Sequence, residues 1–136
     1  RAGDGGALLL GAVTQARSLQ QATQLLESRA AAGPLCPNGR SSTSARTLET
    51  VVVKYFATGV QIWLADLNRR ERQLLPPIEN LETQLAPVLP EHYRQWSAKR
   101  KTVLMLLRDT PREHITALQH LAASCSESVL TPPTQS

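Results

Sequence analysis

The sequence is poor in aromatic residues, with two Trp, two Tyr and one Phe among 136 residues. Leu, Val and Ala must therefore supply most of any core, and the hydrophobic content of 41% lies slightly below the usual globular range. No apolar run approaches the roughly 18 residues of a membrane-spanning helix, so we predict no membrane span. The net charge of +4 permits an acidic partner without requiring one.

The residues that carry enzyme chemistry are few and scattered. The sequence has no two-histidine zincin motif and no CxxC pair, and its histidines are isolated, so we predict no metal site. These histidines are His92, His114 and His120. The Gly-rich stretch 3–6 lacks the strand and the Lys-Ser/Thr of a phosphate loop, and Cys125 has no adjacent base. We predict no catalytic residue, no cofactor and no small-molecule substrate, and therefore a non-enzymatic protein.

The chain has two cysteines, Cys36 in a predicted loop and Cys125 near a helix end. The simplest interpretation is two reduced thiols in an intracellular protein, in the nucleus or the cytoplasm. The alternative is one disulfide that joins the first loop to the last helix. That alternative would place the protein in a secreted compartment.

Residues 47–75 form the longest apolar helical pattern of the chain. At about 100° per residue their apolar side chains cover an arc of roughly 200°. A surface helix needs a stripe of only about 100°, so the wider arc predicts a central helix with neighbours on two sides. Pro76 and Pro77 are expected to end this helix. A buried strand over 51–56 is the alternative, because β-branched residues are poor helix formers.

Four further segments have helical patterns: 7–32, 78–86, 91–108 and 110–125. The last begins with a capping box, in which Thr110 and Glu113 are spaced to satisfy each other's backbone amides. In this last segment His114 falls near the apolar stripe, which predicts a buried, hydrogen-bonded histidine. The fold class is therefore all-α, a four- to five-helix bundle with a long central helix. We expect one domain over 7–125, with a disordered first loop 33–46, a flexible N-terminus 1–6 and a disordered tail 126–136.

Basic side chains form the most suggestive pattern. Residues spaced by seven line one flank of the predicted fourth helix, and a second cluster lies near the end of the central helix. The first set is Arg94, Lys101 and Arg108; the second is Arg69, Arg70 and Arg72. Asp66 is spaced to pair with Arg70. Such clusters contact phosphates or acidic protein surfaces.

Apolar residues on a Pro-punctuated segment suggest a groove or a docking edge, formed by Ile78, Leu81, Leu85, Val88 and Leu89. The leading hypothesis is a protein–protein interaction domain, an adaptor or subunit of a larger intracellular assembly that binds an acidic surface or helix. The alternative is a nucleic-acid-binding domain that uses the basic helix 91–108. A further alternative is a secreted helical-bundle ligand, which requires a Cys36–Cys125 disulfide.

Overall fold

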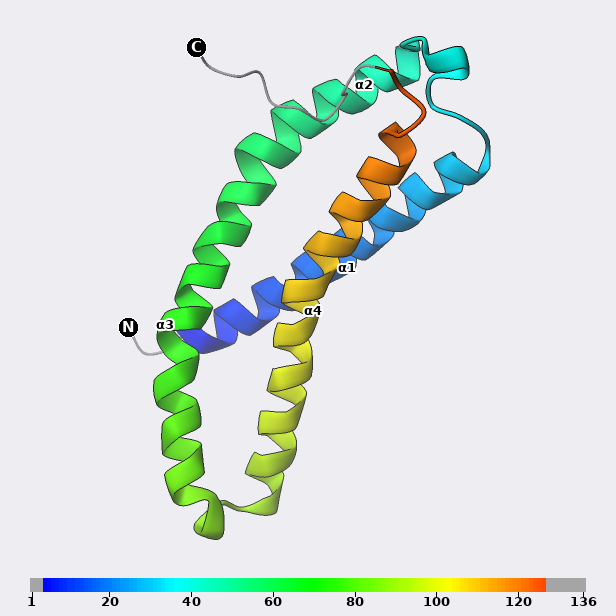
Figure 1. Ribbon diagram of the computed structural model, residues 1–136. Coiled ribbons are helices and arrows are strands. Elements are labelled where there is room, and N and C mark those ends of the chain that lie inside the picture. The colour runs from blue at the N-terminus through cyan, green and yellow to red at the C-terminus, as the bar shows by residue number, and fades with distance from the viewer. Residues whose placement is uncertain (1–3, 127–136) are drawn as a thin grey trace.

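The computed structural model describes residues 4–126, which form three long helices and no strand. The first is α1 (Asp4–Ala31). The second combines α2 (Thr43–Val51), a π-helical segment η2 (Val52–Val60) and α3 (Gln61–Leu85) in one curved rod (Figure 1). The third is α4 (Glu91–Ala122), and short 3₁₀ turns lie at η1 (Pro37–Gly39) and η3 (Ala86–Val88). The all-α prediction is confirmed.

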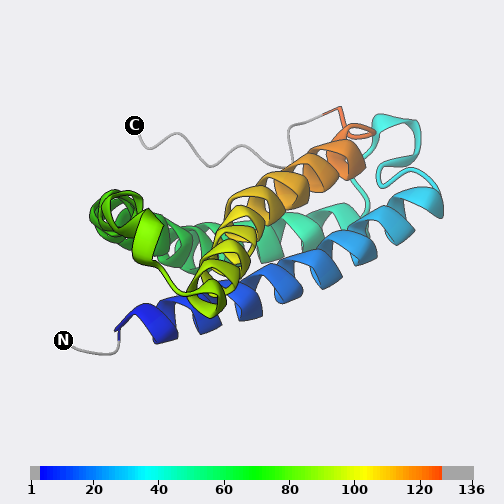
Figure 2. The ribbon, with the colours of Figure 1, turned by 90° about the horizontal axis from the view of Figure 1, so that it is seen from below.

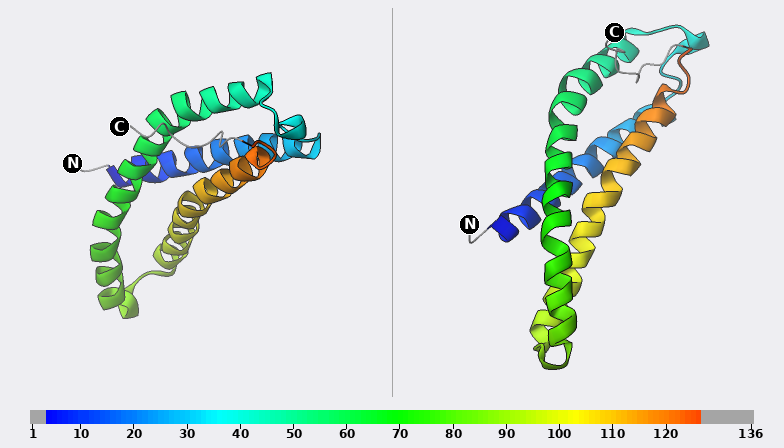
Figure 3. Two further views of the ribbon diagram at one scale, coloured as in Figure 1. Left: turned by 45° about the horizontal axis from the view of Figure 1, so that its top comes forward. Right: turned by 60° about the vertical axis from the view of Figure 1, so that its left-hand side comes forward.

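The rod and α4 form a long hairpin, and α1 lies across it. α1 packs mainly along α4 and runs along one side of the other helices (Figure 2). The end of the hairpin, around η3, extends beyond the N-terminal end of α1 in both views of Figure 3. The hairpin therefore has a part that α1 covers and a part that it does not.

The prediction of four to five helices was wrong, because the prolines do not end helices. Pro76 and Pro77 lie inside α3, and Pro111 lies inside α4. A proline removes one N–H donor and displaces the carbonyl four residues earlier. Pro76 and Pro77 are on an exposed surface, where water can bond those carbonyls. The predicted capping box is wrong for the same reason: Thr110 lies inside α4 and donates to the Leu106 carbonyl at 2.7 Å.

The main core lies where the three helices meet. Small and aliphatic residues from α1, α3 and α4 form it, with Ala12 fully buried against its neighbours. Its buried members are Ala12, Leu19, Leu64, Leu67, Leu104 and Leu107. Small residues allow close approach of helix backbones, and on α1 Gly11 lies so near Trp63 that an added Cβ would be 3.4 Å from its ring.

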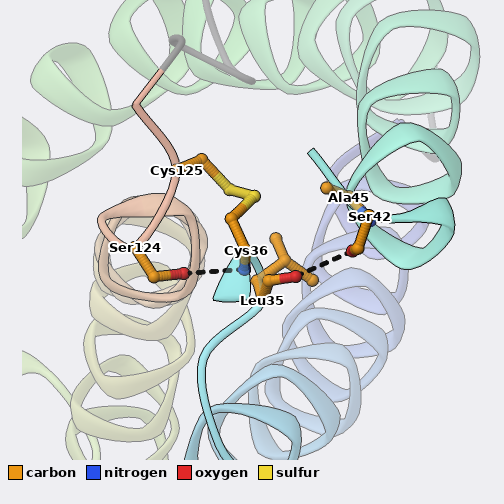
Figure 4. The surroundings of a disulfide bond; sticks show 6 residues. All are labelled: Leu35, Cys36, Ser42, Ala45, Ser124 and Cys125. Atoms are coloured by element: carbon orange, nitrogen blue, oxygen red, sulfur yellow. Dashed lines mark hydrogen bonds between the residues drawn. A yellow bond between two sulfur atoms is a disulfide. The ribbon is translucent and has the colours of Figure 1, made fainter. Parts of the chain in front are cut away.

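A second core surrounds a disulfide between Cys36 and Cys125 (Figure 4). The prediction of reduced thiols was therefore wrong. The segment 33–46 was expected to be disordered, but it is ordered, because Leu35 and Cys36 are buried. The Cys36 amide donates to Ser124 Oγ at 3.1 Å, and Ser42 caps α2 by accepting from the Ala45 amide.

The rod is helical, as the pattern over 47–75 predicted, but it is not wrapped on two sides. No residue of η2 is buried, and Val51, Tyr55 and Ile62 are exposed. The other helices therefore leave part of the predicted apolar arc uncovered. The predicted flexible N-terminus overlaps α1, which begins at Asp4, and the predicted tail lies outside the described residues except for Ser126.

Candidate interaction surface

One apolar seam runs along the rod with alternating spacings of four and three residues. Such a seam is typical of a helix that packs against another along its length. Its members are apolar except for Glu71, and the last of them lies in η3 directly after the rod: Val60, Leu64, Leu67, Glu71, Leu74, Ile78, Leu81, Leu85 and Val88. Its first half is covered: Leu64, Leu67 and Glu71 are buried, and Leu8 and Leu9 of α1 pack against this region.

The second half of the seam is exposed. We call Leu74, Ile78, Leu81, Leu85 and Val88 the hairpin face. Their side chains are 37% to 74% exposed, and nothing among residues 4–126 buries them. Four of the five, Ile78, Leu81, Leu85 and Val88, are apolar residues that the sequence suggested as a docking edge, and Leu89, the other residue suggested, is half-buried. Ile78, Leu81 and Leu85 lie on the unbroken helix α3 and not on a separate short one, and Val88 lies in η3.

A buried ion pair holds the two helices together beside this face. Glu82 of α3 accepts from Arg100 of α4 through both of its oxygens, at 2.8 and 2.9 Å. Tyr93 and Ser97 also donate to Glu82 Oε1, at 2.9 and 3.2 Å. The hydrogen bonds from Arg100 are the main reason that the pKa of Glu82 falls to about 2. Glu82 raises the pKa of Arg100 in return.

The aromatic residues of α4 extend the hairpin surface. The Arg100 guanidinium lies 5.2 Å from the centre of the Trp96 ring, and Tyr93 and Trp96 have ring centres 5.5 Å apart. Trp96 is 47% exposed. A large aromatic ring, held by a fixed cation and partly open to solvent, is typical of interface anchors.

The predicted basic residues divide among different roles. Arg94 donates through Nε and Nη2 to the Leu89 carbonyl, so it stabilises the turn of the hairpin. Arg69 and Arg70 both pair with Asp66, which confirms the predicted Asp66–Arg70 pair and lowers the pKa of Asp66. Lys101 is exposed on α4.

Arg72 and Arg108 do come together, at a cavity of about 480 Å³ between α3 and α4 that Arg112 also lines. Arg108 donates to the buried Glu71 at 2.6 Å. The basic residues therefore do not form one continuous patch. The hypothesis of nucleic-acid binding by 91–108 stays a prediction, and the internal pairing of these arginines gives it no support.

Sequence reasoning missed Glu82 and Glu71, the two carboxylates that join α3 to α4. Glu82 and Arg100 are 18 residues apart, on two predicted helices joined by a turn. The sequence did not show that these helices run antiparallel and side by side. The 4–3 spacing through 74–88 was the signal that could have found the seam. The expected helix break at Pro76 hid it.

The comparisons with known proteins identify a family. A model described as a protein of unknown function, DUF3080, matches residues 4–129. The chain belongs to the DUF3080 family. No curated protein and no solved structure matches it. None of the helices described for this DUF3080 chain is both long and apolar enough to cross a membrane, and the described residues contain no group of three or more potential metal ligands.

Proposed function

We propose that this DUF3080 chain is a non-enzymatic docking domain whose hairpin face binds an amphipathic helix of a protein partner. The observation that carries this proposal is the seam, which is buried where α1 covers it and exposed from Leu74 of α3 to Val88 of η3. The same 4–3 spacing continues across both halves. A second helix laid against the exposed half would meet side chains at the spacing that helix pairs use.

The chemistry of the face favours a partner helix with an apolar stripe and an acidic flank. The apolar anchors come from the rod, and the basic side chains Lys99 and Lys101 lie exposed on α4. Fully burying one Leu or Ile side chain stabilises a complex by about 1.5–3 kcal/mol. The charges would set orientation and association rate more than affinity.

The test is affinity purification with the full chain as bait, using two neighbouring substitutions. Leu81→Asp places a charge on the hairpin face, and Asn80→Asp places the same charge on the adjacent exposed position of the same helix. We expect Leu81→Asp to lose the partner and Asn80→Asp to keep it. A partner that Leu81→Asp retains in full would show that the hairpin face is not the docking surface.

The charge of the partner is tested separately with the double substitution Arg94→Glu/Lys101→Glu. Arg94 also holds the Leu89 carbonyl, so Lys101→Glu alone serves as the variant that leaves the turn intact. If the partner is acidic, Lys101→Glu should capture less of it than the wild type does. Capture by the wild type should also fall more steeply with salt than capture by Lys101→Glu. Equal capture at all salt concentrations would contradict an acidic flank.

We also propose that the chain functions in an oxidising compartment, which makes the secreted helical-bundle ligand the second candidate function. The Cys36–Cys125 disulfide supports this, because disulfides persist in secreted and other oxidising environments and are rare in the cytosol. The expectation of an intracellular location stays a prediction. Thiol titration distinguishes the two locations, if the protein is purified from its natural source and denatured before titration. Two free thiols would contradict the oxidising compartment.

A further inference from the structure

A second apolar feature lies at the other end of the molecule, between α1 and the first part of the rod. Two adjoining cavities of about 450 and 400 Å³ share Leu25, Leu26, Leu48 and Val51 in their linings, so they form one groove. We call it the α1–η2 groove. One wall is α1 from Gln15 to Arg29, and the other is the α2–η2 segment from Thr43 to Val60.

The lining of the groove is apolar and carries charge at one end only. The larger cavity contains no Asp, Glu, Lys or Arg, and its polar members are Gln15, Ser18, Tyr55 and His114. The smaller cavity adds one charged residue, Arg29. Arg29 donates one hydrogen bond to the Gly33 carbonyl at 3.0 Å, which leaves further guanidinium donors for a ligand.

Part of the wall formed by the rod, Val52–Val60, is a π-helix, at whose end the Gln61 amide donates to the Phe56 carbonyl five residues earlier. No residue of η2 is buried. Four η2 residues, Val52, Tyr55, Phe56 and Val60, line the groove. Segments of π-helix inside longer helices occur often at functional sites.

His114 forms part of the floor and is already satisfied. Its Nδ1 lies 3.1 Å from Thr23 Oγ1, and its ring centre lies 5.4 Å from that of Phe56. It therefore supplies packing surface and not a free charge, which keeps the floor neutral at pH 7.

We propose that the α1–η2 groove binds a free long-chain fatty acid, with the alkyl chain along α1 and the carboxylate at Arg29. The wall from Gln15 to Arg29 is about 21 Å long at the rise of an α-helix, comparable to an extended long-chain fatty acid. A single cation at one end of an uncharged channel matches one chain with one anionic head group. A partner helix would instead need polar contacts along both flanks.

The test is isothermal titration of the purified full chain with octanoate, decanoate and dodecanoate below their micelle concentrations. Each added methylene should lower the dissociation constant about fourfold while the groove is being filled. Dodecyltrimethylammonium has a similar chain and a cationic head, and it should bind at least tenfold more weakly than dodecanoate. Equal affinity for both surfactants would overturn the assignment of Arg29.

Four variants localise the binding. Val52→Trp fills the groove and should abolish dodecanoate binding, whereas Val53→Trp makes the same change at an adjacent position outside the lining and should not. Arg29→Gln should weaken dodecanoate binding about tenfold, and Arg29→Lys should restore part of it. Circular dichroism and melting temperature identify any variant that has lost its fold.

The remaining outcomes overturn the proposal. Binding that Val53→Trp and Val52→Trp impair equally would mean a non-specific surface interaction. If dodecanoate has no effect and Val52→Trp instead abolishes a concentration-dependent dimer in sedimentation, then the groove is an interface between two copies. Both results can be told apart from a failure of partner binding at the hairpin face, because that face lies on α3 and η3 and none of these variants changes it.

Discussion

At the scale of single residues, Glu82 has more connections between the two helices of the hairpin than any other side chain described. It accepts hydrogen bonds from Arg100, Tyr93 and Ser97, all on α4. Arg100 itself is buried, and its Nε has no hydrogen-bond partner among residues 4–126. Glu82 is therefore the group that makes burial of this arginine tolerable.

Replacing Glu82 with Gln should lower the free energy of unfolding at pH 7 by about 1.5–3 kcal/mol, the usual contribution of hydrogen bonds to a charged group. The pKa of Glu82 is about 2 in the folded chain against 4.5 ordinarily. A lowered carboxyl pKa stabilises the fold above pH 4.5, and this contribution is lost as the pH falls towards 2. Urea unfolding at pH 7, 4 and 2.5 should therefore show the difference between wild type and Glu82→Gln shrinking. A difference that is constant with pH would contradict this.

His114 should give a separate acid transition at higher pH. Burial lowers its pKa below the ordinary 6.5, so the unfolded chain takes up the proton first as the pH falls. Stability from neutral His114 is complete above pH 6.5 and declines below it. Urea unfolding at pH 7.5, 6.5 and 5.5 should show this decline in the wild type and its absence in His114→Gln. Parallel profiles would show that His114 does not contribute.

The sequence predicted these two residues unequally. His114 was recognisable as a buried, hydrogen-bonded histidine because local helical spacing placed it beside an apolar stripe, and its contacts with Thr23 and Phe56 confirm that. The Glu82–Arg100 pair depends on two helices folding back on each other in one register. Spacing along the chain carries no information about that register.

At the scale of elements, the rod and the disulfide are the two features that local rules misjudged. The period of 3.6 residues over 47–75 identified the helix correctly, because that pattern is independent of what the helix packs against. The helix end at Pro76 was wrong because the cost of an internal proline depends on whether water can reach the freed carbonyls. Whether water reaches those carbonyls depends on how the two helices of the hairpin pack, which the local sequence does not show.

The disulfide should contribute substantially to stability, because Cys36 and Cys125 are 89 residues apart. Closing so long a loop restricts the unfolded chain, and removing such a bond typically costs about 2–5 kcal/mol. We expect the double substitution Cys36→Ser/Cys125→Ser to lower the urea midpoint accordingly, and dithiothreitol to lower it in the wild type. Dithiothreitol should not affect the double variant. A wild-type midpoint that is insensitive to reduction would contradict this role.

At the scale of the whole molecule, three helices leave more apolar surface than they can bury. On the rod, exposed apolar side chains lie at the groove wall near Val51 and on the hairpin face near Leu81, and others are exposed on α1 and α4. The arc of about 200° over 47–75 predicted burial of the rod by neighbours on two sides, and that prediction was wrong, because part of this apolar surface stays exposed. We assign the exposed part at the groove to a ligand.

These two regions should act independently. Residues 52 and 81 are separated along the rod by about 40 Å at the helical rise, and substitutions more than 10 Å apart without shared contacts are usually additive within about 0.5 kcal/mol. Leu81→Asp should therefore leave the dissociation constant for dodecanoate unchanged. The unfolding free energies of Leu81→Asp, Val52→Trp and their combination should also add. Coupling above about 1 kcal/mol would instead show that the rod transmits a conformational change between its ends, since no direct contact could account for it.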